Sequence, residues 1–158
     1  MLYQFNIMRM AHPKHSEVMQ SFFSQVDAVN RLAIESNGFI WRPTDDSDPV
    51  IQSRLGTDVL VNLSAWESID TLYGFVFNPR HRAVMVSKDR WFEDTGKANS
   101  VLWSEDTLTL AKPEWSEAID RLESLWRLGP TEYAFDFAWA LQNDLTRQPA
   151  WDVFSTDS

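Results

Sequence analysis

The segment DVLVNLSAW, residues 58–66, decides the fold, because its side chains alternate between two faces. Val59, Val61 and Leu63 fall on one face, and the side chains between them, including Asn62, fall on the other. Alternation with a period of two is typical of a strand whose two faces have different surroundings. The segment therefore predicts one strand of a sheet, and the rest of the chain can be assigned outward from it.

Three further strands are predicted on either side of this one. Residues 2–9, LYQFNIMR, alternate in the same way and place Asn6 on the face opposite their aromatic side chains. Residues 38–42, GFIWR, and residues 100–110, SVLWSEDTLTL, are also rich in strand-forming side chains. Residues 132–137, EYAFDF, are predicted as a short edge strand.

Helices are predicted between these strands. Apolar residues recur every three or four positions from Ser16 to a glycine stop at Gly38, which indicates a long amphipathic helix. Residues 67–77 predict a short helix, and Asn78 followed by proline predicts the start of a helix that runs to about Arg90. A last helix is predicted inside PEWSEAIDRLESLWRLGP, at 113–130, while TDDSDP is predicted as an exposed acidic turn.

This order of elements predicts an α+β fold, the ferredoxin-like β-α-β-β-α-β arrangement with additions. An antiparallel sheet of this kind has helices on one face, so its other face has to be solvated or covered by another chain. A homodimer is therefore expected. Residues 1–137 are predicted to form this domain, and residues 138–158, which lack clear periodicity, a C-terminal extension.

The composition limits the chemistry. The 158 residues include no cysteine, which excludes disulfides, thiolate nucleophiles and sulfur-ligated metals. The net charge of −9 opposes binding to nucleic acid. With no long apolar run and no secretory signal, we expect a cytoplasmic protein that does not bind membranes. Eight tryptophans and ten phenylalanines suit either a core or a pocket for a flat apolar molecule.

Several blocks resemble a known family when they are taken together in chain order. GFIWR, VLVNLSAWESIDTLYGFVF, RHR, RWF, VLW and GPTEYAFDF are similar to the domain-of-unknown-function family 3291, from about Leu2 to Phe137. The resemblance implies the dimeric α/β-barrel superfamily, in which two ferredoxin-like sheets close back to back. Its members include cofactor-free monooxygenases acting on aromatic polyketides, polyketide cyclases and haem-degrading monooxygenases.

The haem-degrading enzymes of this superfamily use an asparagine, a tryptophan and a histidine. Asn6 matches the asparagine and His81 matches the histidine. Phe75 stands where the tryptophan is expected, and the segment leading to the histidine is shorter. The resemblance therefore implies two of the three site residues and counts against haem degradation.

His81 is the candidate catalytic residue. On a helix that begins at Pro79 it shares a face with Val84, Met85 and Phe92, so it is expected to point along an apolar stripe. The alternative is a histidine held in the core or dimer seam by one hydrogen bond. A metal site would need more ligands, and no cluster of histidines or carboxylates offers them, so no metal is expected.

Asn6 and Asn62 are expected on the strand faces opposite the helices, where they would look into the barrel interior. A side-chain amide there can hold a ligand carbonyl or an enolate. The alternative is that the two pair with each other or with the backbone. The candidate substrate-binding residues are Asn62, Trp41, Tyr73, Phe75, Arg82, Met85, Trp91 and Phe92, whereas Trp66 and Trp103 are assigned to the core.

The favoured function is a small-molecule enzyme acting on an aromatic or polyketide-like substrate. His81 would remove a proton and Asn6 would hold the resulting enolate, as in a cofactor-free monooxygenase or a cyclase. The positive charge of Arg82 and its neighbours suits an anionic ligand group, or is merely a solvated helix face. Two alternatives stay open, namely a haem-binding or haem-degrading protein with His81 as axial ligand, and a dimeric ligand-binding protein or scaffold without catalysis.

Overall fold

The computed structural model describes residues 1–105 and 111–143. Its four strands form one antiparallel sheet in the order β2-β3-β1-β4. This is the strand order of a ferredoxin-like fold, so the predicted fold class is confirmed. The strands are β1 (Leu2–Arg9), β2 (Phe39–Trp41), β3 (Val59–Trp66) and β4 (Ser100–Ser104).

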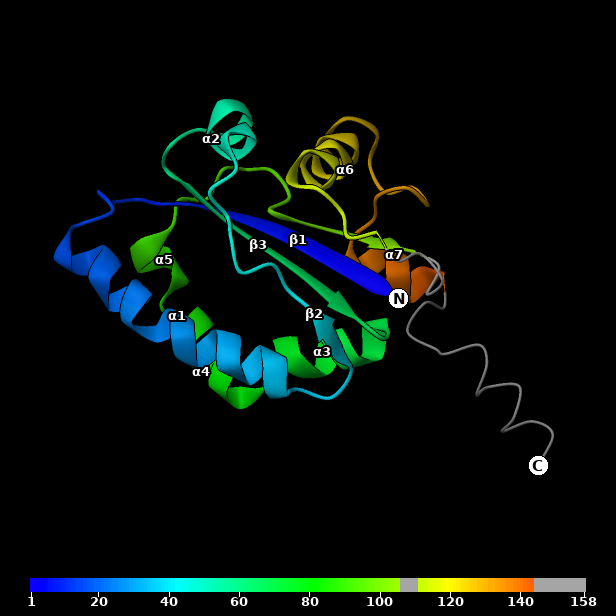
Figure 1. The fold of residues 1–158 in the computed structure, drawn as a ribbon, viewed down its shortest axis with the longest axis horizontal. Helices are drawn as coiled ribbons and strands as arrows, with labels where there is room; N and C mark the ends of the chain where they lie inside the picture. Colours follow the sequence, from blue (N-terminus) through cyan, green and yellow to red (C-terminus); the bar gives the residue numbers. More distant parts are fainter. Residues whose placement is uncertain (106–110, 144–158) are drawn as a thin grey trace.

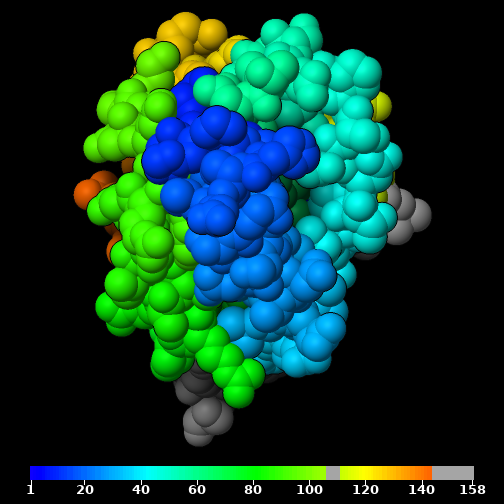
Figure 2. Space-filling view, turned by 90° about the vertical axis from the view of Figure 1, so that its left-hand side faces the viewer, coloured from blue at the N-terminus to red at the C-terminus, as the bar shows by residue number. Residues whose placement is uncertain are grey.

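Helices lie on both sides of this sheet (Figure 1). One layer contains α1, α3, α4 and α5, and the other contains α2 and α6 (Figure 1). The space-filling view shows α1 lying between the segment of α3 to α5 and the segment that follows β2 (Figure 2). The helices are α1 (Glu17–Glu35), α2 (Pro49–Leu55), α3 (Ile69–Val76), α4 (Pro79–Met85), α5 (Lys88–Trp91), α6 (Trp115–Leu128) and α7 (Phe137–Gln142).

The expectation that helices cover only one face of the sheet is corrected here. Tyr3 and Phe5 of β1 pack in one core cluster with Ile51 of α2 and with Ile119 and Leu122 of α6. All five side chains are at least 90% buried. The face of Asn6 and Asn62, which was expected to lie away from the helices and to face a second subunit, is the face covered by α1 and α3 to α5. Because the chain covers both faces of the sheet, that argument for a homodimer is removed.

Helix α2 is one of two helices that the sequence prediction missed, the other being α7. Asp48 caps it by accepting a hydrogen bond from the Val50 N–H at 2.9 Å, and Pro49 occupies its first turn. Both residues fall in the segment predicted as an exposed acidic turn. The same pairing of a capping side chain with a proline was recognised at Asn78 and Pro79, where α4 begins.

The other face of the sheet carries two separate apolar clusters. The α3 cluster centres on Leu2, Ala33, Trp66, Ile69, Leu72, Phe75, Leu102, Phe135 and Ala140. The α5 cluster centres on Met10, Met19 and Trp91, with Val18, Phe22, Phe23, Leu60, Val84 and Phe92 packed against it. The two clusters lie toward opposite ends of β1, because Leu2 belongs to the first and Met10 to the second.

Several predicted boundaries differ from those observed. The helix expected to run to Arg90 is two helices, α4 and α5, and part of the strand expected over 100–110 lies outside the described residues. The edge strand predicted at 132–137 is reduced to a single bridge between Phe135 and Leu102, with both backbone hydrogen bonds formed at 2.8 and 2.9 Å.

The extension predicted from residue 138 begins inside α7, where Ala140 is fully buried and Trp139 stacks on Phe135 with ring centroids 4.7 Å apart. The rest of that extension, including Trp151 and Phe154, lies outside the described residues. Within the described ranges, no helix combines the length and apolar character that a membrane crossing needs.

Candidate functional site

A band of polar side chains crosses the sheet between the α3 cluster and the α5 cluster. Asn6 of β1 is the cross-strand partner of Asn62 in β3 and of Ser100 in β4, and Gln4 is the partner of Ser64. Side chains two residues apart on a strand share a face, and cross-strand partners do so as well. We call these five residues the polar band; it lies on the face covered by α1 and by α3 to α5.

Four of the five residues of the polar band are partly exposed although the band lies beneath helices, whereas Ser64 is buried. β1 has a strand on each side, and its side chains toward α2 and α6 are buried, with Tyr3, Phe5 and Ile7 at 1%, 0% and 6% exposed. On the opposite face of the same strand, Gln4 and Asn6 stay partly exposed. The layer of α1 and α3 to α5 therefore does not close over the band.

The two asparagine side chains of the band are available to a ligand. Asn6 and Asn62 are cross-strand neighbours, yet no hydrogen bond joins their amides, and neither amide has a partner among the described residues. The other members are engaged, since Gln4 Nε2 donates to Ser100 Oγ at 3.5 Å and Ser64 Oγ accepts from Trp66 Nε1 at 2.9 Å. The alternative in which the two asparagines satisfy each other is therefore not what the structure has.

His81 is held in one tautomer by the backbone. Its Nδ1 lies 2.9 Å from the Val76 carbonyl oxygen. Because a carbonyl oxygen only accepts, Nδ1 carries the hydrogen and donates it, which leaves the lone pair of the neutral ring on Nε2. Burial lowers the pKa of His81 below 6.5, and the hydrogen bond to Val76 opposes this shift. The ring is therefore a neutral base at pH 7.

Helix α4, which carries His81, spans from the α3 cluster to the α5 cluster, and we call the stretch between these two clusters the interval. Its ring lies 4.8 Å from the ring of Phe75, which belongs to the α3 cluster. Val84, one turn further along α4, packs against the α5 cluster. Helix α4 thus extends from one cluster to the other, and His81 contacts the α3 cluster through Phe75.

Three of the predicted substrate-binding residues belong to the two clusters that border this interval. Phe75 is buried and stacks on Trp66 at the α3 end, with ring centroids 5.2 Å apart. At the α5 end, Trp91 is buried and donates to Ser21, while Phe92 packs edge-on to Phe22. Met85 is partly buried on α4.

The structure does not bring three other predicted residues to the site. Trp41 packs against the cluster on the opposite face of the sheet, beneath Lys112, because a register shift between Phe39 and Trp41 pairs it with Ala65 of that face. Tyr73 is 42% exposed on the outer side of α3. Arg82 is exposed and lies over the ring of Phe77, 5.7 Å from its centroid, so its charge is directed away from the band.

Other residues of the interval were missed by the sequence analysis. Gln4, Ser64 and Ser100 extend the band, and the alternation of their strands was sufficient to place Gln4 beside Asn6. Val26 lies on the inward stripe of α1, midway between buried Met19 and buried Ala33, and it is partly exposed. No periodicity distinguishes it from a core residue.

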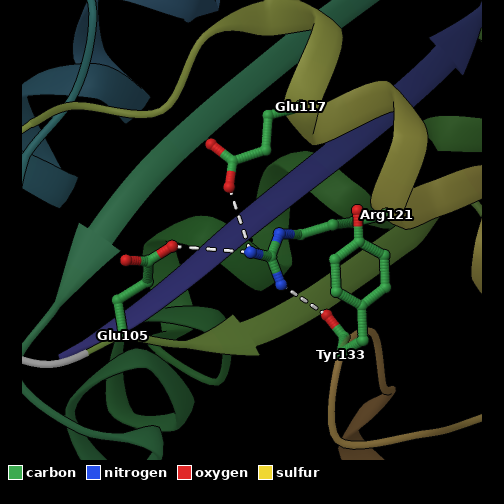
Figure 3. Close-up of polar contacts among 4 residues, drawn as sticks. All are labelled: Glu105, Glu117, Arg121 and Tyr133. Carbon is green, nitrogen blue, oxygen red and sulfur yellow. Dashed lines mark hydrogen bonds and ion pairs between the residues drawn. The ribbon is translucent and has the colours of Figure 1, made fainter.

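A second cluster of polar groups, on the α6 side of the sheet, is closed to ligands. The Arg121 guanidinium bonds Glu117 at 3.0 Å, Glu105 at 3.5 Å and the Tyr133 carbonyl oxygen at 2.6 Å (Figure 3). It also lies between the rings of Trp103 and Tyr133. Its side chain is 12% exposed, so the cluster joins structural segments and offers no free charge. No group of histidines and carboxylates suited to a metal occurs in residues 1–105 and 111–143.

The sequence matches the family described as Domain of unknown function (DUF3291) over residues 1–151. The chain belongs to this family. The match includes the strands that carry the polar band, the helix that carries His81 and the helix α7. The family match thus runs past residue 137, where the sequence blocks end. The comparison with curated proteins gave no match.

Solved structures that resemble this DUF3291 chain share little sequence with it. They include SnoaB, a cofactor-independent oxygenase from Streptomyces nogalater, with 13% identity, a TM-score of 0.47 and coverage of 70% of this chain and 97% of that one. An uncharacterized NIPSNAP domain protein from Burkholderia xenovorans has 16% identity, a TM-score of 0.44 and coverage of 70% and 100%. Protein Atu4242 from Agrobacterium tumefaciens has 10% identity, a TM-score of 0.43 and coverage of 71% of this chain and 100% of that one.

Proposed function

We propose that this protein is an enzyme that removes a proton from an activated carbon of a flat, uncharged aromatic or polyketide-like molecule. The single observation that carries the proposal is the state of His81, whose Nδ1–H is bound to the Val76 carbonyl so that Nε2 holds a free lone pair. In this proposal the lone pair faces the interval that holds the amides of Asn6 and Asn62, neither of which has a partner among the described residues. A base beside hydrogen-bond donors is the minimum that enolate chemistry needs.

In the proposed proton abstraction, His81 on the helix side removes the proton and an asparagine on the sheet side binds the product. Nε2 of His81 takes the proton from the C–H bond, and the electron pair of that bond moves onto the adjacent carbonyl oxygen, giving an enolate and an imidazolium. The NH₂ group of Asn6 or Asn62 donates a hydrogen bond to the enolate oxygen. The pKa of His81, lowered by burial, keeps the base unprotonated at pH 7.

The enolate can then react in two ways that use the same residues. Attack of the carbanion on a second carbonyl of the substrate closes a ring, and the imidazolium then returns its proton to the new alkoxide. Alternatively, the carbanion reacts with dioxygen and takes up the proton to give a hydroperoxide, which loses water and leaves a ketone. Neither outcome requires a flavin or a metal, so we propose a cyclase or a cofactor-free monooxygenase.

The character of the interval supports a neutral, planar substrate. None of the five residues of the polar band is ionisable, and the rings of Phe75 and Phe22 belong to the clusters on either side of it. Aromatic side chains stack on flat molecules, while amides and hydroxyls pair with their carbonyl and phenol groups. The site is thus suited to a ring system that bears several oxygen atoms.

Haem binding is the second candidate, and the same observation favours it. A metal-ligating histidine usually donates its other ring N–H to a carbonyl, as His81 does to Val76. His81 would be the axial ligand through Nε2, and bound haem would supply redox chemistry. Reconstitution with haem tests this directly, because axial ligation adds a Soret band that His81→Ala would remove.

The proposed proton abstraction is tested with a hydroxylated anthrone as probe, since its activated CH₂ group exchanges with deuterated water. His81→Ala is expected to reduce protein-catalysed exchange about 100- to 10,000-fold, the usual contribution of a general base. Exchange is followed by NMR without oxygen, and oxygen uptake is measured separately. His15→Ala, an exposed histidine outside the interval, is the matched control and should leave the exchange rate unchanged.

A structural role for His81 gives a different result. If the variant loses its cooperative melting transition, or if His81→Ala and His15→Ala exchange the probe at the same rate, His81 is not the base. Asn6→Ala provides an independent variant on the sheet side. It is expected to lower exchange while leaving the melting temperature near that of the unmodified protein, because the Asn6 side chain has no partner among the described residues.

A further inference from the structure

The outer side of α3 carries an exposed aromatic pair. Tyr73 and Phe77 stack with ring centroids 4.2 Å apart, and they are 42% and 46% exposed. The Arg82 guanidinium lies 5.7 Å from the Phe77 centroid, and the Phe137 ring lies edge-on to Tyr73 at 6.4 Å. We call these four residues the outer patch. Exposed large rings gathered with a cation mark a surface that another segment can cover.

The outer patch lies where the described chain approaches its end. Phe137 is the first residue of α7, and α7 ends at Gln142. A helix rises about 1.5 Å per residue, so the end of α7 is about 9 Å from Phe137 along its axis. The eight residues from 144 to 151 can span up to about 26 Å when extended. The chain that follows α7 is therefore long enough to return to the patch.

The composition of residues 144–158 is complementary to the outer patch. The segment contains Trp151 and Phe154, and three aspartates against one arginine. Arg80 and Arg82 on α4 are exposed and form no ion pair within the described part of the chain, although the whole protein is acidic. Opposite charges bring such segments together, and the rings then remove apolar surface from water.

We propose that residues 144–158 dock on the outer patch of their own chain, with Trp151 and Phe154 packed against Tyr73 and Phe77. The match to the DUF3291 family supports this, since it continues past α7 to residue 151 and so includes Trp151 in the domain. The docked segment covers the outer side of α3 and α4. This surface is distinct from the polar band, so the inference does not depend on the proposed catalysis.

Disulfide trapping tests the proposal cleanly, because the chain contains no cysteine. Gly74→Cys places a thiol beside Tyr73, where an added Cβ meets no atom within 4 Å, and Val153→Cys places its partner in the terminal segment. The control pairs Val153→Cys with Gln52→Cys, an exposed position of α2 on the opposite side of the sheet. Docking is expected to make the Gly74 pair close at least about tenfold faster within one chain.

Two results would overturn the proposal. Equal closure rates for the Gly74 and Gln52 pairs would mean that the segment does not dock on the patch. Disulfides formed only between chains would mean that a second copy covers it. The rings are tested by adding Phe77→Ser or Trp151→Ser to the Gly74 pair, which should slow closure toward the control rate at an unchanged melting temperature. Unchanged closure in both variants would equally contradict docking through these rings.

Discussion

At the scale of single residues, the decisive contact is the hydrogen bond from His81 to the backbone of α3. The Val76 carbonyl belongs to the end of that helix, where the last carbonyls lack partners within the helix. One contact therefore satisfies an otherwise free acceptor and orients the imidazole. It also explains why the residue types in the sequence leave the role of His81 open, because the tautomer depends on which atom of another helix faces the ring.

The pH dependence of activity follows from the lowered pKa of His81. A general base works in its unprotonated form, so kcat/KM is expected to rise with pH through a pKa below 6.5 and to stay level above it. The measurement is a profile from about pH 5 to about pH 8 with the anthrone probe. A profile that kept rising above pH 7 would assign the base to another group.

The same shift affects stability. The pKa of His81 is lower in the folded chain than in the unfolded chain, so the unfolded state binds more protons between the two values. Stability is therefore retained at neutral pH and is lost as the pH falls below about 6.5 toward the folded pKa. His81→Asn should weaken this acid dependence in urea unfolding, whereas His15→Asn should preserve it.

At the scale of elements, the turn between α1 and β2 is locked to α3. Gly38 has a φ of +81°, and a Cβ added there would lie 2.3 Å from the Thr71 side chain. Thr71 itself takes part in the capping box that begins α3 with Ser68. The close approach thus couples the end of one helix of the layer to the start of another.

Gly38→Ala is expected to destabilise the fold by more than the strain of a left-handed alanine alone. That strain is about 1–2 kcal/mol, and displacing Thr71 adds the loss of a helix cap, about 1 kcal/mol. Gly96→Ala is the control, since Gly96 also has a positive φ, +72°, but open space around it. Urea unfolding of both variants gives the comparison, and equal losses of stability would show that Thr71 yields without cost.

Alternating sequence patterns were sufficient to predict strands, but not what covers each face of the sheet. The alternation in residues 2–9 and 58–66 predicted β1 and β3 correctly, and with them the shared face of Asn6 and Asn62. It did not show that this face meets α1 and α3 to α5, because alternation separates two faces without saying what covers each. That assignment depended on α2, a seven-residue helix too short to give a periodic signal.

At the scale of the whole molecule, Arg121 connects segments that are far apart in sequence. It joins α6 to the end of β4 through Glu105 and to the segment after α6 through the Tyr133 carbonyl (Figure 3). The ring of Tyr3 also stacks on that of Trp103, with ring centroids 5.3 Å apart. Burial and the nearby Glu105 and Glu117 raise the pKa of Tyr3. The layer of α6 is thus fixed to the sheet by charge and stacking together.

Arg121→Met is expected to lower the free energy of unfolding by about 1–3 kcal/mol, because Glu105 and Glu117 lose a cation and the Tyr133 carbonyl loses a donor. The loss is limited because both carboxylates are partly exposed and solvent screens them. Arg127→Met on the exposed side of α6 is the control and should change stability little. Equal urea midpoints for the two variants would contradict the connecting role of Arg121.

The bridge between Phe135 and Leu102 has a consequence for how the protein behaves among other copies of itself. β4 is the last strand of the sheet on its side, and strands in that position offer unpaired amides and carbonyls to any extended chain that approaches. Phe135 already forms hydrogen bonds with both backbone groups of Leu102, at the middle of β4. A strand from another molecule therefore cannot pair with a continuous row of free backbone groups along β4. One residue thus protects the protein against aggregation by strand addition.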